Sequence, residues 1–133
     1  MDELSFFGTG AQFEHIGLVV PDIATAHPCS TPTVDPLQKV AVDVVSIHGI
    51  TVELIEPMSV DSPVSAALMN NQKLVHLCFT VPDLRAAIST SRPHGFHLIA
   101  RPVPAAAFAG REIAWVYSKI FGLVELLEMH DGT

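Results

Sequence analysis

Cationic residues are scarce in this chain, and their scarcity excludes the simplest anionic partners. Seven lysine and arginine residues stand against fourteen aspartate and glutamate residues, which gives 133 residues a formal net charge of −7. The cations are scattered and form no basic patch, so nucleic-acid binding is not expected. An anionic substrate would have to rely on a few local cations, because the overall field would not attract it.

Thiols and long apolar segments are also scarce. The two cysteines, Cys29 and Cys78, do not form a Cys-X-X-Cys pair, which favours reduced thiols in a cytoplasmic protein over a disulfide. The acidic first residues lead into no apolar segment, so we expect no signal peptide. No apolar run approaches the roughly 20 residues that span a bilayer, so we expect no membrane partner.

Hydrophobic residues, by contrast, are abundant. They make up 49% of the chain, charged residues make up 16%, and the mean hydropathy is +0.40. A chain of this length suffices for one domain with a real core but not comfortably for two. The apolar excess must be buried in that core or covered by a partner, and the second option favours a homodimer.

One stretch of sequence occurs twice, at an offset of 61 residues. Residues 15–23 and 76–84 each begin with a histidine, continue as an apolar run and close with Val-Pro-Asp and an aliphatic residue. Each copy is followed further along the chain by Val-Glu-Leu, at 52–54 and at 124–126. Such a duplication indicates two copies of one supersecondary unit.

Apolar periodicity and the positions of proline and glycine predict the same element order, strand–helix–strands, in both halves. In the first half we expect a strand over 13–20, a short helix that Asp22 can cap, a proline-rich loop over 27–36, and a hairpin of 40–47 with 50–55. A linking helix should begin at Asp61–Pro63 and end near residue 71. In the second half we expect a strand over 75–81, a helix capped by Asp83, a strand over 97–103, and a hairpin of 112–118 with 123–127.

Four residues occupy matching places in the two copies: His15 and His76, and Glu53 and Glu125. Both glutamates interrupt apolar strands, where an unpaired carboxylate would be costly. If the copies face each other about a pseudo-two-fold axis, the four side chains converge. Two imidazole nitrogens and two carboxylate oxygens suit a divalent first-row ion, and the lack of thiolates argues against a structural zinc.

Each of these residues has a plainer interpretation when taken singly. A lone strand histidine is most often structural, and a lone Val-Glu-Leu is most often an exposed carboxylate. Their joint occurrence favours the metal site. An open position on the ion would then polarise a carbonyl and stabilise an enolate.

Other candidates carry less weight. His27 and His48 fall in an expected loop and an expected turn, and we expect both to be solvated. The pair Phe6 and Phe7 suits the core or a dimer contact better than an aromatic cage. The apolar loop 102–110, which is flanked by arginines, is a candidate lid, although solvated arginines are the default expectation.

These motifs together resemble the vicinal-oxygen-chelate superfamily, which includes glyoxalase I, methylmalonyl-CoA epimerase, extradiol dioxygenases and antibiotic-binding resistance proteins. The likeness is chiefly to epimerase-like and glyoxalase-like members and covers nearly the whole chain. It rests on residues 13–22, 52–57, 62–63, 76–84 and 113–126.

The resemblance implies an α+β fold in which two βαβββ modules form a curved mixed sheet around a cleft. It implies one glyoxalase-like domain over residues 1–133, with module one at about 11–58, a linking helix at about 61–71 and module two at about 74–128. It also assigns the four metal-ligand positions to His15, Glu53, His76 and Glu125. The ion in similar enzymes is Co, Ni, Mn, Zn or Mg.

The chain departs from the epimerases in two places. The segment between Asp22 and Val40 is much shorter, so we expect the first module to be abbreviated. Epimerases carry a catalytic glutamate just before the strand that begins here at Val40, and this chain has Leu37-Gln38 instead. A glyoxalase-like scheme remains available, in which a ligand glutamate dissociates and acts as the base.

The predicted function is therefore that of a metal-dependent isomerase, epimerase or lyase for a small carbonyl-containing substrate. Glu125 would move the proton, with Glu53 as its partner. The alternative is a non-catalytic, antibiotic-type binding protein that uses the same cleft, although such proteins typically lose the ligand residues that are kept here. A third possibility is an iron dioxygenase, whose triad of two histidines and one carboxylate leaves Glu53 without a natural role.

Overall fold

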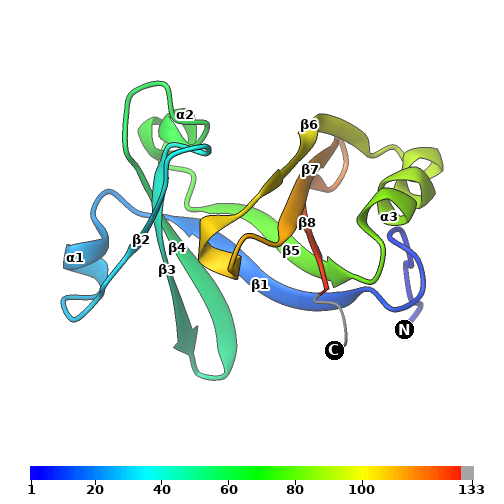
Figure 1. Cartoon of the computed structure of the whole chain (residues 1–133), viewed down its shortest axis with the longest axis horizontal. Helices are drawn as coiled ribbons and strands as arrows, with labels where there is room; N and C mark the ends of the chain where they lie inside the picture. The colour runs from blue at the N-terminus through cyan, green and yellow to red at the C-terminus, as the bar shows by residue number, and fades with distance from the viewer. Residues whose placement is uncertain (130–133) are drawn as a thin grey trace. The chain divides into compact units, whose positions relative to one another are not determined.

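Two copies of one βαβββ unit make up the chain in the computed structural model, which describes residues 1–129 (Figure 1). The first copy contains β1 (Gln12–Val19), α1 (Ile23–Ala26), β2 (Thr33–Asp35), β3 (Val40–Ile47) and β4 (Ile50–Pro57). The helix α2 (Ser65–Met69) links the copies. The second copy contains β5 (Leu74–Val81), α3 (Leu84–Ser91), β6 (His97–Pro104), β7 (Glu112–Ser118) and β8 (Gly122–Glu128), with 3-10 turns η1 (Arg92–His94) and η2 (Ala106–Phe108).

The strands form a mixed sheet in the order β2-β3-β4-β1-β5-β8-β7-β6. In each copy the first strand pairs in parallel with the last, β1 with β4 and β5 with β8. The pairs β2–β3, β3–β4, β6–β7 and β7–β8 are antiparallel. The predicted α+β fold of two βαβββ modules is thus confirmed. The abbreviation of module one is confirmed too, because α1 has four residues and β2 has three, whereas α3 and β6 have eight each.

The duplicated stretch forms the first strand of each copy and buries the same face of it. In β1 the buried residues alternate as His15, Gly17 and Val19, as the sequence pattern predicts. In β5 His76 and Cys78 are buried in the same alternation. Both histidines therefore point away from solvent at the head of an apolar strand.

The chain divides into two compact units, whose boundary falls inside β1 and β5. Unit 1 comprises Met1–Glu14, Leu77–Ala105 and the residues from Gly110 onward. Unit 2 comprises His15–His76 together with the short segment Ala106–Ala109. No helix in the described part of the chain is long and apolar enough to span a membrane.

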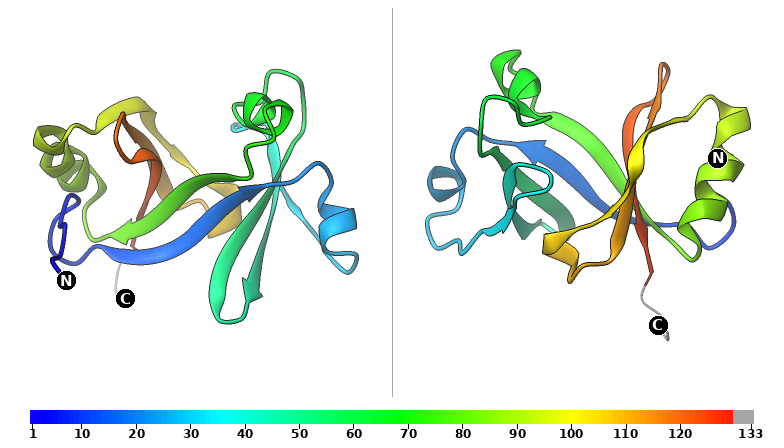
Figure 2. Two further views of the ribbon diagram at one scale, coloured as in Figure 1. Left: turned by 180° about the vertical axis from the view of Figure 1, so that it is seen from behind. Right: turned by 45° about the horizontal axis from the view of Figure 1, so that its top comes forward.

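Helix α3 covers the core of unit 1. Its apolar stripe, Leu84, Ala87 and Ile88, is buried as predicted, and it packs in one cluster with Phe7 of the N-terminal segment. The predicted cap is also present, since the Asp83 carboxylate accepts a hydrogen bond from the backbone N–H of Ala86 at 3.1 Å. Figures 1 and 2 show the N-terminal segment beside α3.

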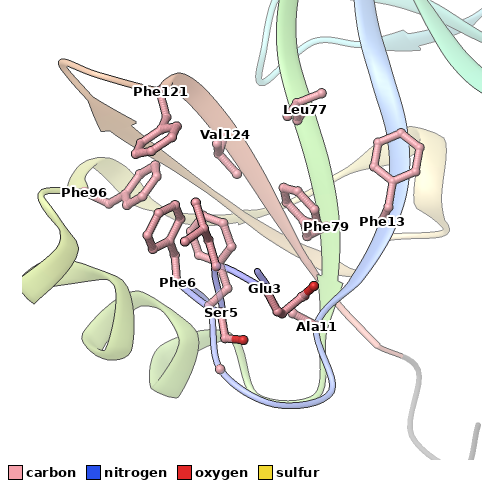
Figure 3. A pocket seen from close by; sticks show the side chains of 13 residues that line it. Glu3, Ser5, Phe6, Ala11, Phe13, Leu77, Phe79, Phe96, Phe121 and Val124 are labelled. Atoms are coloured by element: carbon pink, nitrogen blue, oxygen red, sulfur yellow. The ribbon is translucent and has the colours of Figure 1, made fainter. Parts of the chain in front are cut away.

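Phenylalanine rings surround a cavity of about 350 Å³ in unit 1 (Figure 3). The rings contact one another, for example Phe6 with Phe121 at a centroid distance of 4.9 Å and Phe7 with Phe96 at 5.0 Å. Phe7 is buried, in agreement with a core role for the Phe6–Phe7 pair. Six of the seven phenylalanines line this cavity: Phe6, Phe7, Phe13, Phe79, Phe96 and Phe121.

Two element predictions in unit 2 are wrong in detail. The expected loop over 27–36 contains β2, which pairs antiparallel with β3 at the end of the strand order. Proline is tolerated at the ends of such an edge strand, because one side of the strand has no ladder to complete. The linking helix begins at Ser65 and not at Asp61, because the Asp61 carboxylate is bound by Lys39 Nζ and Ser59 Oγ and caps no helix.

Candidate metal centre

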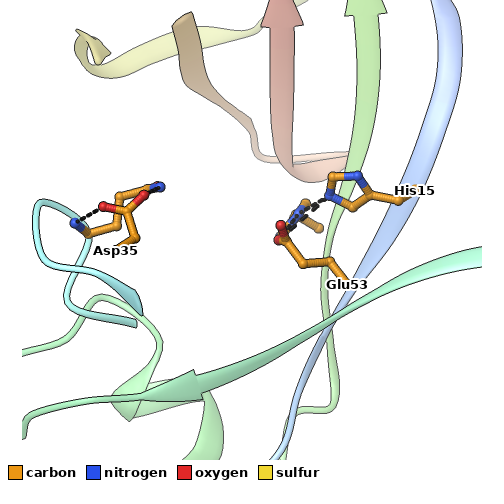
Figure 4. Close-up of polar contacts among 5 residues, drawn as sticks. His15, Asp35 and Glu53 are labelled. Atoms are coloured by element: carbon orange, nitrogen blue, oxygen red, sulfur yellow. Dashed lines mark hydrogen bonds and ion pairs between the residues drawn. The ribbon is translucent and has the colours of Figure 1, made fainter. Parts of the chain in front are cut away.

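Three of the four predicted ligands meet inside unit 2 (Figure 4). The Nε2 atoms of His15 and His76 lie 3.2 Å apart. Glu53 Oε1 lies 3.6 Å from His15 Nε2 and 3.7 Å from His76 Nε2. The residues are 0%, 6% and 5% exposed in the order His15, His76, Glu53, so the cluster is almost fully withdrawn from water.

The spacing of these three atoms fits a divalent ion. A point about 2 Å from each atom exists at the centre of the triangle they form, and metal–imidazole and metal–carboxylate bonds are about 2.0–2.2 Å long. Two nitrogens and one oxygen are donors that first-row divalent ions accept. A buried carboxylate needs a compensating charge, and a cation held there would supply it.

The local register explains why the three side chains meet. In the parallel β1–β4 ladder, Glu53 stands opposite Gly17, two residues after His15 and on the same buried face. Gly17 leaves room for the His76 imidazole, since a Cβ on Gly17 would lie 2.1 Å from His76 Cε1. Sequence reasoning missed this role of Gly17. The signal was the repeat itself, in which a glycine in one copy stands where the other copy has Cys78.

Glu125 occupies the corresponding place in the second copy. It is 2% exposed on β8, and in the parallel β5–β8 ladder it stands opposite Cys78, two residues after His76. Glu125 belongs to unit 1 whereas the other three residues belong to unit 2, and the membership of Glu125 in the centre stays a prediction.

At the position where epimerases carry a glutamate, Leu37 and Gln38 donate hydrogen bonds to the carboxylate of Asp35. The Gln38 side chain donates to the Asp35 carboxylate at 2.8 Å, and the backbone N–H groups of Leu37 and Gln38 donate to its other oxygen at 3.1 and 3.2 Å. Asp35 also accepts from the backbone N–H of Ala106 at 3.3 Å. A buried carboxylate that accepts four hydrogen bonds fixes the backbone around it.

The expectation that His27 and His48 are solvated is confirmed for only one of them. His48 is exposed in the turn between β3 and β4, as expected. His27 is not simply solvated, because its Nδ1 lies 2.7 Å from the carboxylate of Asp43 on β3. The hydrogen bond from His27 lowers the pKa of Asp43 below its usual value.

Comparison with known proteins agrees with this description. A duplicated βαβββ unit that brings two histidines and a glutamate together defines a two-module fold with a candidate metal centre. A family model for the Glyoxalase/Bleomycin resistance protein/Dioxygenase superfamily matches residues 14–115. The chain belongs to this superfamily, and the predicted resemblance is confirmed.

Solved structures of similar fold include methylmalonyl-CoA epimerases. A hypothetical protein from Bacillus halodurans is 23% identical, with a TM-score of 0.79 over 94% of this chain and 99% of that one. The Mycobacterium tuberculosis epimerase is 20% identical, with a TM-score of 0.74 over 89% and 87%. A Streptomyces coelicolor epimerase variant in complex with 2-nitronate-propionyl-CoA is 22% identical, with a TM-score of 0.70 over 90% and 95%. At these identities the likeness establishes the fold alone, and a comparison with curated proteins finds no match.

Proposed function

We propose that the chain is a divalent-metal-dependent isomerase or epimerase, or a lyase of the same type, that acts on a small carbonyl-containing substrate. The observation that carries this proposal is the meeting of His15, Glu53 and His76 in unit 2, with donor atoms 3.2–3.7 Å apart. Membership of the superfamily and the epimerase neighbours support the reaction class.

Glu125 is the proposed fourth ligand and the proposed proton carrier. Its support is the repeat: Glu125 stands opposite Cys78 as Glu53 stands opposite Gly17. The ion, when bound, would polarise the substrate carbonyl and stabilise the charge that develops when the adjacent carbon loses a proton. The two histidines would hold the ion throughout, and Glu125 would take the proton and return it, with Glu53 as its partner.

Metal content and metal-dependent stability test the ion. Purified protein should contain bound divalent metal, and metal-free protein should gain thermal stability on addition of Co, Ni, Mn, Zn or Mg. His76→Ala should abolish this gain, whereas His48→Ala, in the exposed turn, should keep it. Protein that contains no ion and gains no stability from any of the five would contradict the proposal.

Proton exchange tests the chemistry. In D2O, metal-loaded protein should incorporate deuterium at the carbon next to the carbonyl of a 2-substituted acyl-CoA or of a glutathione hemithioacetal, as followed by NMR. Glu125→Gln should remove the exchange and leave substrate binding. Binding of such a compound without exchange in the wild-type protein would instead favour the non-catalytic binding function.

We further infer a homodimer in the cytoplasm. The support for the dimer is the exposed apolar surface of unit 2, which includes Val34, Val44, Ile47 and Ile50, each between 42% and 54% exposed. Sedimentation velocity should give twice the chain mass of 14.3 kDa. Replacing Ile47 and Ile50 by serine should shift the equilibrium toward monomer, and a wild-type monomer at high concentration would contradict the dimer.

A further inference from the structure

One aromatic ring outside the phenylalanine cluster of unit 1 is that of Phe108, which lies on the candidate metal centre. Phe108 stacks on the His15 imidazole, with ring centroids 5.5 Å apart and an interplanar angle of 12°. Of the seven phenylalanines, Phe108 is the one that does not line the cavity of unit 1, and its segment Ala106–Ala109 belongs to unit 2 with His15. The stacked ring covers one face of a residue that we assign as a metal ligand.

The segment that carries Phe108 is held at two further points in unit 2. The backbone N–H of Ala106 donates to the buried carboxylate of Asp35 at 3.3 Å. Ala107 packs against the apolar cluster of Val40, Val42 and Ile55. The three successive residues of η2 therefore make a hydrogen bond through Ala106, an apolar contact through Ala107 and a ring stack through Phe108.

The backbone after Phe108 is unusual. Ala109 has a φ of 57° and Gly110 a φ of 79°, so two consecutive residues are left-handed. A left-handed alanine has no local advantage and persists only where the surroundings determine the conformation. The turn closes through hydrogen bonds from Gly110 N–H to Ala105 O and from Ala105 N–H to Arg111 O, both 3.0 Å.

We propose that Phe108 is a positioning residue of the metal centre, held in place by Asp35. This inference rests on the proposed metal site. The phenyl ring fixes the plane of the His15 imidazole so that Nε2 stays directed at His76 and Glu53, and it excludes water from that face of the ligand.

Binding of Co(II) alone to the full-length, metal-free chain tests this role. Phe108→Ala should weaken Co(II) binding about tenfold and alter the visible d–d absorption, because outer residues that orient a ligand typically change affinity by roughly 10–100-fold. Phe108→Leu, which keeps apolar cover but has no ring plane, should fall between Phe108→Ala and wild type. The matched control is Phe121→Ala, which makes the same change in the aromatic cluster of unit 1 and should leave affinity and spectrum unaltered.

Asp35→Asn provides a second variant of the same shape. Its amide nitrogen would face the donors of Gln38 and Ala106, which should loosen the segment and shift Co(II) affinity in the same direction as Phe108→Ala. Wild-type affinity and spectrum in Phe108→Ala would overturn the positioning role and leave the metal site standing. Absence of Co(II) binding in the wild-type protein would overturn the metal site, and this inference with it.

Discussion

Gly17 and His76 lie on neighbouring strands so closely that a methyl group on Gly17 would come within 2.1 Å of His76 Cε1 and 2.2 Å of Nδ1. Non-bonded atoms do not approach this closely. The His76 imidazole of the second module therefore occupies the space that the absent side chain of Gly17 in the first module leaves open. The repeat thus needs an asymmetric pair, glycine in one copy and Cys78 in the other, to bring His15 and His76 together.

Gly17→Ala should therefore displace the His76 ring. We expect a loss of about 1–3 kcal/mol in the free energy of unfolding, the usual cost of overpacking, and a loss of divalent-metal binding. A double-mutant cycle with His76→Ala isolates the clash, because removing the imidazole removes what the new methyl group meets. Equal costs of Gly17→Ala in the two backgrounds, measured by urea denaturation, would contradict this account.

The strands, their buried faces and the meeting of His15, Glu53 and His76 could be predicted from the sequence, whereas other contacts around the centre could not. His15 and His76 each precede an apolar run that Pro-Asp terminates, so period-two alternation suffices to place them on the buried face. Strand β2 escaped prediction because Pro32 and Pro36 read as a loop, and only the strand order reveals an edge where prolines are tolerated.

The stack of Phe108 on His15 could not be predicted from the sequence, for a different reason. Its anchor Asp35 is 71 residues away from Ala106 in sequence, and the turn that aims the ring uses a left-handed alanine at 109, which no sequence rule favours. Gly17, by contrast, could have been found, because comparing the two repeat copies residue by residue singles it out.

The aromatic cluster of unit 1 should be a main source of stability. Phe96 is 1% exposed and contacts Phe6, Phe7 and Phe121. Phe96→Ala should lower the free energy of unfolding by about 3–5 kcal/mol, since the ring is lost and a cavity is left. Phe121→Ala should lower the free energy of unfolding much less, because Phe121 is 50% exposed. Similar costs in urea denaturation would mean that the cluster is not packed as described.

Asp61 should titrate at unusually low pH. The hydrogen bond from Lys39, followed by that from Ser59, lowers its pKa from 3.8 to about 2. Because the pKa in the folded protein lies below that of the unfolded chain, the stabilisation is present above about pH 4 and is lost as the pH falls toward 2. Carbon-13 NMR of the side-chain carboxyl should give this midpoint, and Lys39→Met should raise it toward the ordinary value. An unchanged midpoint in that variant would exclude Lys39 as the cause.

The two Val-Pro-Asp motifs provide a matched test of helix capping. Asp83 accepts a hydrogen bond from the Ala86 backbone N–H, whereas Asp22 caps no backbone group and accepts instead from the Thr25 hydroxyl at 2.7 Å. Asp83→Ala should therefore cost about 1 kcal/mol of unfolding free energy, the usual value of an N-cap, and Asp22→Ala should cost clearly less. The difference follows from α3 being a real eight-residue helix and α1 a single four-residue turn. Equal losses in the two variants would show that the aspartate stabilises both helices alike. That result would contradict the inference that the two copies diverge after Val-Pro-Asp.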